Sequence, residues 1–219
     1  FSPGGGGLAI DTYNEEITSW YLNEFWKRLQ VSEGSVRSFF HDSFEYDGNL
    51  PVHFRKEFKK RRGYDFAEYL NVLAGDCIDE NIIARIRSDY RETLSDLVLE
   101  SFIGTMTKWA NNHQSLMRNQ AHGSPGNILD IYAACHIPET EKFGPVDKDR
   151  VDVFINKFAS SAAHVTGRKL VSSESFTWLN ENWTVTIADM FQGANRLFLS
   201  GVNHIFFHGF AYSPEDAEW

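Results

Sequence analysis

The strongest constraint on the fold is the alternation of short, β-like apolar runs with longer amphipathic helical segments along the chain. In residues 14–29, for example, Ile17, Trp20, Tyr21 and Phe25 recur at helical spacing. We expect strands at residues 8–10, 36–40, 115–122, 129–137, 170–173 and 202–207, and helices at 14–29, 53–62, 66–74, 80–112, 151–165 and 186–199. Such alternation is typical of βαβ units with parallel strands and predicts an α/β protein.

Two architectures are built from such units, the (β/α)8 barrel and the doubly wound open sheet. No glycine-rich phosphate-binding loop follows any expected strand, and the glycine run at residues 4–7 precedes one instead. No linker or internal repeat divides the chain. We therefore expect residues 1–219 to form one domain of the (β/α)8 TIM-barrel type, with the doubly wound sheet as the alternative.

Charge and composition exclude several classes of function. The formal net charge of −9 argues against binding to the phosphate backbone of a nucleic acid. No run of about 18 apolar residues is present, so no membrane span is expected. The two cysteines, Cys77 and Cys135, show neither disulfide nor zinc spacing. Aromatic residues reach 15%, which suits either an aromatic-rich core or a pocket that stacks on sugar rings.

Carboxylates and histidines follow nearly every expected strand. In a barrel the active site lies at the carboxyl ends of the strands, so these side chains would meet in one cleft. The candidates are Asp42 and Glu45, His122, Glu139 and Glu141, Glu174 with Trp178, and His208. A fortuitous polar rim is the simpler explanation, but the repetition from strand to strand favours a catalytic cleft.

Glu45 and Glu174 are the candidate catalytic pair. Both follow apolar strands and lie among aromatic residues, which can desolvate a carboxyl group and also stack on a sugar. Paired carboxylates without a cofactor motif suggest glycoside hydrolysis, in which one acid protonates the leaving oxygen and the other works on the opposite face of the sugar. Taken alone, each glutamate could also be a surface-loop acid.

The other candidates have weaker support. Glu139 and Glu141 could bind Ca²⁺, which prefers oxygen ligands, or could simply be an acid pair at a helix start. His122 and His208 could donate hydrogen bonds to sugar hydroxyls or be satisfied core histidines. Asp42 and Trp178 are further candidates for substrate binding, Trp178 by stacking on the apolar face of the sugar.

Several long motifs, in order along nearly the whole chain, resemble glycoside hydrolase family 106, the α-L-rhamnosidases. They are FFHDSFEYDG at residues 39–48, KRRGYD at 60–65, DYRETLSD at 89–96, QAHGSP at 120–125, IPETE at 137–141, GVNHI at 201–205 and HG at 208–209. Together these motifs are far more specific than any one alone.

The resemblance implies a (β/α)8 catalytic barrel that hydrolyses terminal α-L-rhamnosyl linkages with inversion. It implies that Glu45 is the general acid and Glu174 the general base. It also implies a calcium ion in or near the active site, with Glu139 and Glu141 as the expected ligands. The partner would be a rhamnose-containing glycan or glycoside, and polysaccharide degradation would suit a secreted or periplasmic parent protein.

The resemblance also suggests a strand count. If residues 202–207 form the eighth strand, Glu174 follows the seventh, Glu45 follows the fourth and residues 8–10 form the third, so the first two β/α units would lie upstream of this segment. Two other functions remain open. One is a retaining β-galactosidase-like barrel with its carboxylates after the same strands, and the other is a carbohydrate-binding barrel without catalysis.

Overall fold

The computed structural model describes residues 7–45, 48, 50–75, 79–143, 152–177 and 184–209. Five strands form one parallel sheet: β1 (Ser38–His41), β2 (Leu116–Gln120), β3 (Ile137–Phe143), β4 (Ser172–Thr177) and β5 (His204–Phe207). Each strand pairs with the next one along the chain, in the order β1-β2-β3-β4-β5. A doubly wound sheet reverses its strand order at a switch point, so this sequential order matches the barrel and not the alternative.

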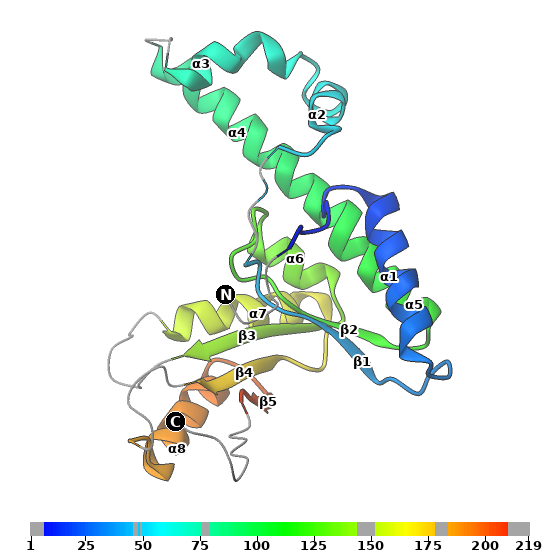
Figure 1. Ribbon diagram of the computed structural model, residues 1–219. Helices are drawn as coiled ribbons and strands as arrows, with labels where there is room; N and C mark the ends of the chain where they lie inside the picture. The colour runs from blue at the N-terminus through cyan, green and yellow to red at the C-terminus, as the bar shows by residue number, and fades with distance from the viewer. Residues whose placement is uncertain are drawn as a thin grey trace, which may run out of the picture.

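Helices cover one face of the sheet (Figure 1). Helix α5 (Thr105–Asn112) packs on β2, α6 (Ile128–Ala134) and α7 (Asp152–Thr166) pack on β3, and α8 (Ile187–Leu199) contacts β4. Helix α1 (Glu15–Leu29) packs against α5 and begins at Asn14, whose side chain accepts hydrogen bonds from the N–H groups of Glu16 and Ile17. No helix among the described residues is both long and apolar enough to cross a membrane.

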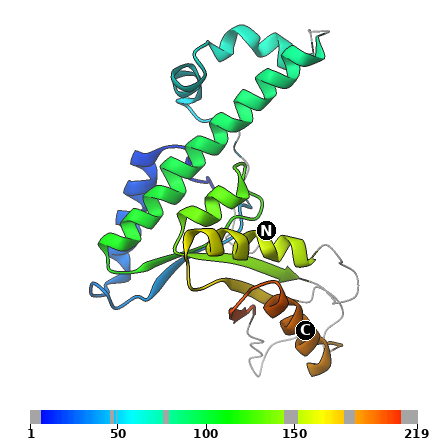
Figure 2. The ribbon, with the colours of Figure 1, turned by 180° about the vertical axis from the view of Figure 1, so that it is seen from behind.

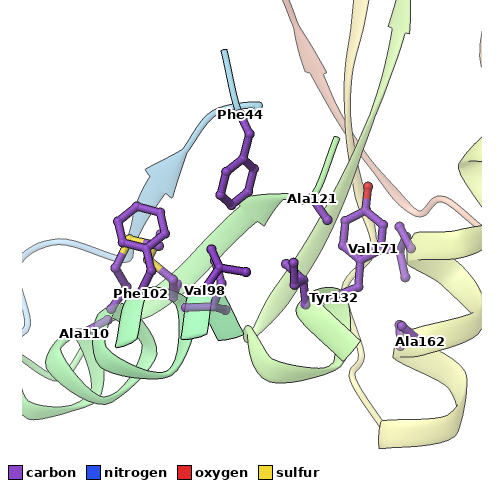
Figure 3. Packing of buried hydrophobic residues seen from close by; sticks show 14 of the residues in the cluster. Phe44, Val98, Phe102, Ala110, Ala121, Tyr132, Ala162 and Val171 are labelled. Atoms are coloured by element: carbon purple, nitrogen blue, oxygen red, sulfur yellow. The ribbon is translucent and has the colours of Figure 1, made fainter. Parts of the chain in front are cut away.

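The main core lies between this helix layer and the sheet. Phe39, Met117 and Ile205 extend from the strands into it, and Figure 3 shows Phe44 reaching from the loop after β1 toward Phe102 and Val98. Because side chains alternate along a strand, the residue next to each of these core positions lies on the opposite face of the sheet. We call that opposite face, which carries Phe40, Arg118 and Phe206, the inner face.

A helical arm follows β1 and projects away from the sheet in both views (Figures 1 and 2). It comprises α2 (Phe54–Arg62), the 3₁₀ helix η1 (Phe66–Tyr69), α3 (Leu70–Ala74) and most of α4 (Glu80–Leu97). Its own apolar cluster consists of Phe54, Phe58, Phe66, Ile86, Leu94 and Leu97. Helix α4 continues through the π-helical segment η2 (Val98–Gly104) into α5, so the long helix expected over residues 80–112 is confirmed.

Two expected strands are wrong. Residues 8–10 form no strand, and Leu8 is fully exposed. These residues line one cavity together with Phe39 and Phe40 of β1. Residues 129–137 are mostly helix α6, which begins after Asn127, whose side chain accepts a hydrogen bond from the N–H of Leu129. The true strand is β3, and its inward-facing Glu139 and Glu141 break the apolar run that the sequence pattern favoured.

Candidate active site

Polar side chains form a row across the inner face. Arg118 and Gln120 come from β2, Glu139 and Glu141 from β3, and Glu174 from β4. The strand register places Gln120 opposite Glu139, and Glu141 opposite Glu174. Thr140, between the two glutamates of β3, instead points to the helix layer, where its hydroxyl donates to Asn156 of α7 at 2.9 Å. The strand alternation therefore brings acids from two neighbouring strands together on one side of the sheet.

Glu139 is the most deeply buried acid of the row, with no exposed surface. One of its oxygens, Oε2, accepts hydrogen bonds from Arg118 at 2.8 Å and from the hydroxyl of Ser172 at 2.5 Å. The other, Oε1, faces the side-chain amide of Gln120 at 3.3 Å. Burial raises the pKa of Glu139, while the hydrogen bond from Ser172 and the charge of Arg118 oppose that rise.

Aromatic rings hold Arg118 in place. Its guanidinium lies 4.1 Å from the ring centre of Phe40 on β1 and 3.6 Å from that of Phe206 on β5. Cation–π contacts with two rings and the ion pair with Glu139 leave this cation little freedom. Arg118 is therefore a fixed part of the inner face rather than a mobile charge.

Glu174 lies next to Glu139 and is 7% exposed. Its Oε2 accepts a 2.6 Å hydrogen bond from the side-chain amide of Gln120. Its Oε1 lies 3.3 Å from Nε2 of His208, which follows β5. Nδ1 of that histidine forms a very short contact with the hydroxyl of Thr177 at the end of β4. Nitrogen atoms thus contact both oxygens of Glu174.

Glu141 lies opposite Glu174 in the strand register and near the loops that follow β1 and β2. Its Oε1 lies 3.3 Å from Nε2 of His122. Burial raises the pKa of Glu141; the charge of His122 opposes the rise, and the charges of Glu174, Asp42 and Glu45 add to it. The charges of all four residues act on one carboxyl group, so residues from three separate parts of the sequence converge on one region.

Glu45 is exposed and lies in the loop that follows β1. The hydroxyl of Ser43 donates to its Oε1 at 3.3 Å, and the N–H of Ser43 donates to Asp42 at 2.8 Å. Phe44, between Ser43 and Glu45, is buried in the core, and its N–H donates to the carbonyl of His122 at 2.8 Å. This anchor fixes the Asp42–Glu45 loop against the loop that carries His122.

Gly123 makes that anchor possible, and replacing it by Ala is expected to disable the site. Its φ is +73°, and an added Cβ would lie 2.6 Å from the carbonyl oxygen of Phe44. The loop bearing Glu45 would have to move, and displacements of about 1 Å at an active site can cost about 100-fold in rate. We expect kcat to fall about that much in the full-length protein. Gly63→Ala is the control, because Gly63 has a φ of +83° but an added Cβ there would have no atom within 4 Å. An equal loss of kcat in both variants would show that the close approach to Phe44 is not the cause.

The structure brings together most of the residues that the sequence singled out. Asp42, Glu45, His122, Glu141, Glu174 and His208 share one region, and Glu139 is buried within the same row. Trp178 lies outside the described residues. Arg118 and Gln120 were missed. The signal that could have found them is their spacing of two residues on an expected strand, which puts both on the same face.

The predicted calcium ligands fit the structure unequally. Both oxygens of Glu139 are already engaged by Arg118, Ser172 and Gln120, so Glu139 does not fit as a ligand. Within the described part of the chain, no group of three or more acidic, histidine or cysteine side chains is arranged to hold a metal ion. The calcium ion stays a prediction from the resemblance, with Glu141 as the remaining candidate ligand.

Parallel strands in sequential order, with carboxylates gathered on the face away from the helices, make up part of a glycoside hydrolase barrel. The chain belongs to glycoside hydrolase family 106: the family model, described as alpha-L-rhamnosidase, matches residues 1–218. The family predicted from the sequence motifs is thereby confirmed.

Two relatives cover nearly all of this chain. A solved structure of a rhamnosidase from Novosphingobium sp. PP1Y matches with a TM-score of 0.80 and 25% identity, over 92% of this chain and 21% of that one. A Formosa agariphila protein named "Putative beta-glucuronidase" is 25% identical over 221 residues, which is 97% of this chain and 19% of that protein. The five strands correspond to a half-barrel, and the chain spans about a fifth of each relative's length.

Proposed function

We propose that this chain carries the catalytic centre of an inverting glycoside hydrolase that removes terminal α-L-rhamnosyl residues. Glu45 protonates the glycosidic oxygen, and Glu174 takes a proton from the water that attacks the anomeric carbon. Further β/α units of the full-length protein complete the barrel around the half described here.

The contrast between the two carboxyl groups is the observation that carries this assignment. Glu174 is nearly buried, and Gln120 and His208 contact its two oxygens, which suits a carboxylate that must be charged and fixed to act as a base. Glu45 is exposed in the loop after β1, where it can reach a leaving group. Both lie close enough to Glu141 for their charges to act on it.

The sugar is proposed to be an uncharged deoxyhexose rather than a uronic acid. A free cation is the strongest partner for the carboxylate of a glucuronide, but Arg118 on the inner face is already paired with Glu139 and contacts two aromatic rings. The name of the Formosa agariphila relative makes β-glucuronides the second substrate class to test. Natural glycans that contain rhamnose are the proposed partners.

We expect the full-length protein to hydrolyse an aryl α-L-rhamnoside and to leave the aryl β-glucuronide and β-galactoside intact. Proton NMR of the first minutes of reaction should show β-L-rhamnose as the first product, because inversion of an α linkage gives the β anomer. If α-L-rhamnose appears first, the inverting mechanism is wrong. Cleavage of the β-glucuronide instead of the rhamnoside would overturn the proposed substrate.

A further inference from the structure

The side-chain amide of Gln120 bridges two acids on neighbouring strands. Its Nε2 lies 2.6 Å from Oε2 of Glu174 and 3.3 Å from Oε1 of Glu139. Gln120 has no exposed surface, and Glu139 is equally buried. An amide nitrogen has two N–H donors, so this one group can satisfy both carboxylates at once.

The surrounding contacts fix which way the amide points. Arg118 and Ser172 hold Glu139, and the rings of Phe40 and Phe206 hold Arg118. Rotating the amide by half a turn would place its oxygen against the oxygens of two acids, which would repel it. The pair of Arg118 and Glu139 therefore keeps the nitrogen of Gln120 aimed at Glu174.

We propose that Gln120 is a positioning residue for Glu174, and that the Arg118–Glu139 pair orients it. The proposal rests on the proposed function, in which Glu174 is the general base. A hydrogen bond donated to a carboxylate stabilises its charged form and restricts its rotation. Gln120 thus holds one oxygen of Glu174, while the other, which His208 approaches at 3.3 Å, keeps a second lone pair for a proton of the attacking water.

Several charged or titratable groups surround the carboxyl group of Glu174. Glu139 and Glu141 approach from β3, His208 from the segment after β5, and Arg118 acts from β2 through Glu139. Among these groups, Gln120 donates a hydrogen bond to Glu174 without adding a charge of its own. The hydrogen bond from Gln120 is buried, so its electrostatic strength is greater than the same hydrogen bond would have in water.

The test is the pH dependence of kcat/KM for an aryl α-L-rhamnoside in the full-length protein. Gln120→Met keeps the volume and removes the donor. We expect kcat/KM at its optimum to fall about 10- to 100-fold, the effect of one charge-assisted hydrogen bond. The acidic limb of the profile should move up by about one pH unit, because Glu174 then holds its proton more tightly. Gln120→Glu should move the limb at least as far, because a third acid disfavours ionisation of Glu174.

Asn156→Leu is the matched control, since it also removes a buried amide beside the sheet but on the helix side of β3. It should lower the melting temperature without moving the acidic limb. A limb that stays in place in both Gln120 variants would overturn the proposal, as would an equal movement in Asn156→Leu. If Gln120→Met does not fold, Gln120→Glu decides the question alone.

Glu174→Gln separates this inference from the proposed function. Near-normal turnover in that variant would remove Glu174 as the base and the proposed mechanism with it. An inactive Glu174→Gln together with unmoved profiles for Gln120 would leave the function standing and reject only the positioning role.

Discussion

Replacing Glu174 by Gln in the full-length protein should lower kcat for an aryl α-L-rhamnoside by about 10²- to 10⁴-fold, the usual contribution of a general base. The amide has nearly the same shape but cannot accept a proton from water. It would also place an N–H₂ group or a neutral oxygen against Nε2 of Gln120, which now donates to the carboxylate at 2.6 Å. The loss should therefore appear in kcat more than in KM.

The pH profile provides a second measurement for Glu174→Gln. The acidic limb of kcat/KM should disappear, because the group whose ionisation it reports is gone. Glu16→Gln is the control, as this acid is exposed on α1 and should leave rate and profile unchanged. A residual rate above about a tenth of the unmodified value would be too fast for the loss of a general base and would refute the role given to Glu174.

Glu45→Gln is expected to lose as much activity, but only toward substrates that need a proton on the leaving group. Alkyl rhamnosides, whose leaving alcohols are weak acids, should react about 10²- to 10⁴-fold more slowly. A dinitrophenyl rhamnoside, whose phenolate leaves without a proton, should lose less than about tenfold. The ratio of the two losses is the measurement.

The same pair of substrates distinguishes the two glutamates. Glu174→Gln should slow both substrates alike, because water activation is needed whatever group departs. If Glu45→Gln also slows both substrates equally, Glu45 is not the acid. An effect limited to KM would instead make Glu45 a substrate-binding residue.

The sequence was most informative where the hydrophobic pattern was unambiguous. The long helix over residues 80–112 and the strand over 202–207 were predicted within a few residues. The apolar run 129–137 was assigned wrongly, because a short run of this kind fits a buried strand or a helix equally well. The cap at Asn127 favours helix α6 over a strand. The sequence pattern did not predict β3 because the inner face of this strand carries glutamates.

The candidate site was predictable as a set of residue types but not as a network. Acids and histidines near the ends of the strands expected from the sequence indicated Glu45, Glu141 and Glu174 as site residues. The hydrogen bonds of Gln120 and the ring contacts of Arg118 depend on strand register, which the sequence pattern does not specify. Glu139 looked like a free ligand for the same reason, since nothing in the sequence shows that three donors already surround it.

The helical arm has a consequence for how such proteins can diverge. It leaves and rejoins the sheet between β1 and β2, and its aromatic cluster is separate from the core beneath the strands. Lengthening, shortening or recomposing its tip would leave the packing of the half-barrel undisturbed. The helical arm can therefore change between relatives while the row of acids on the inner face keeps its strand pairing.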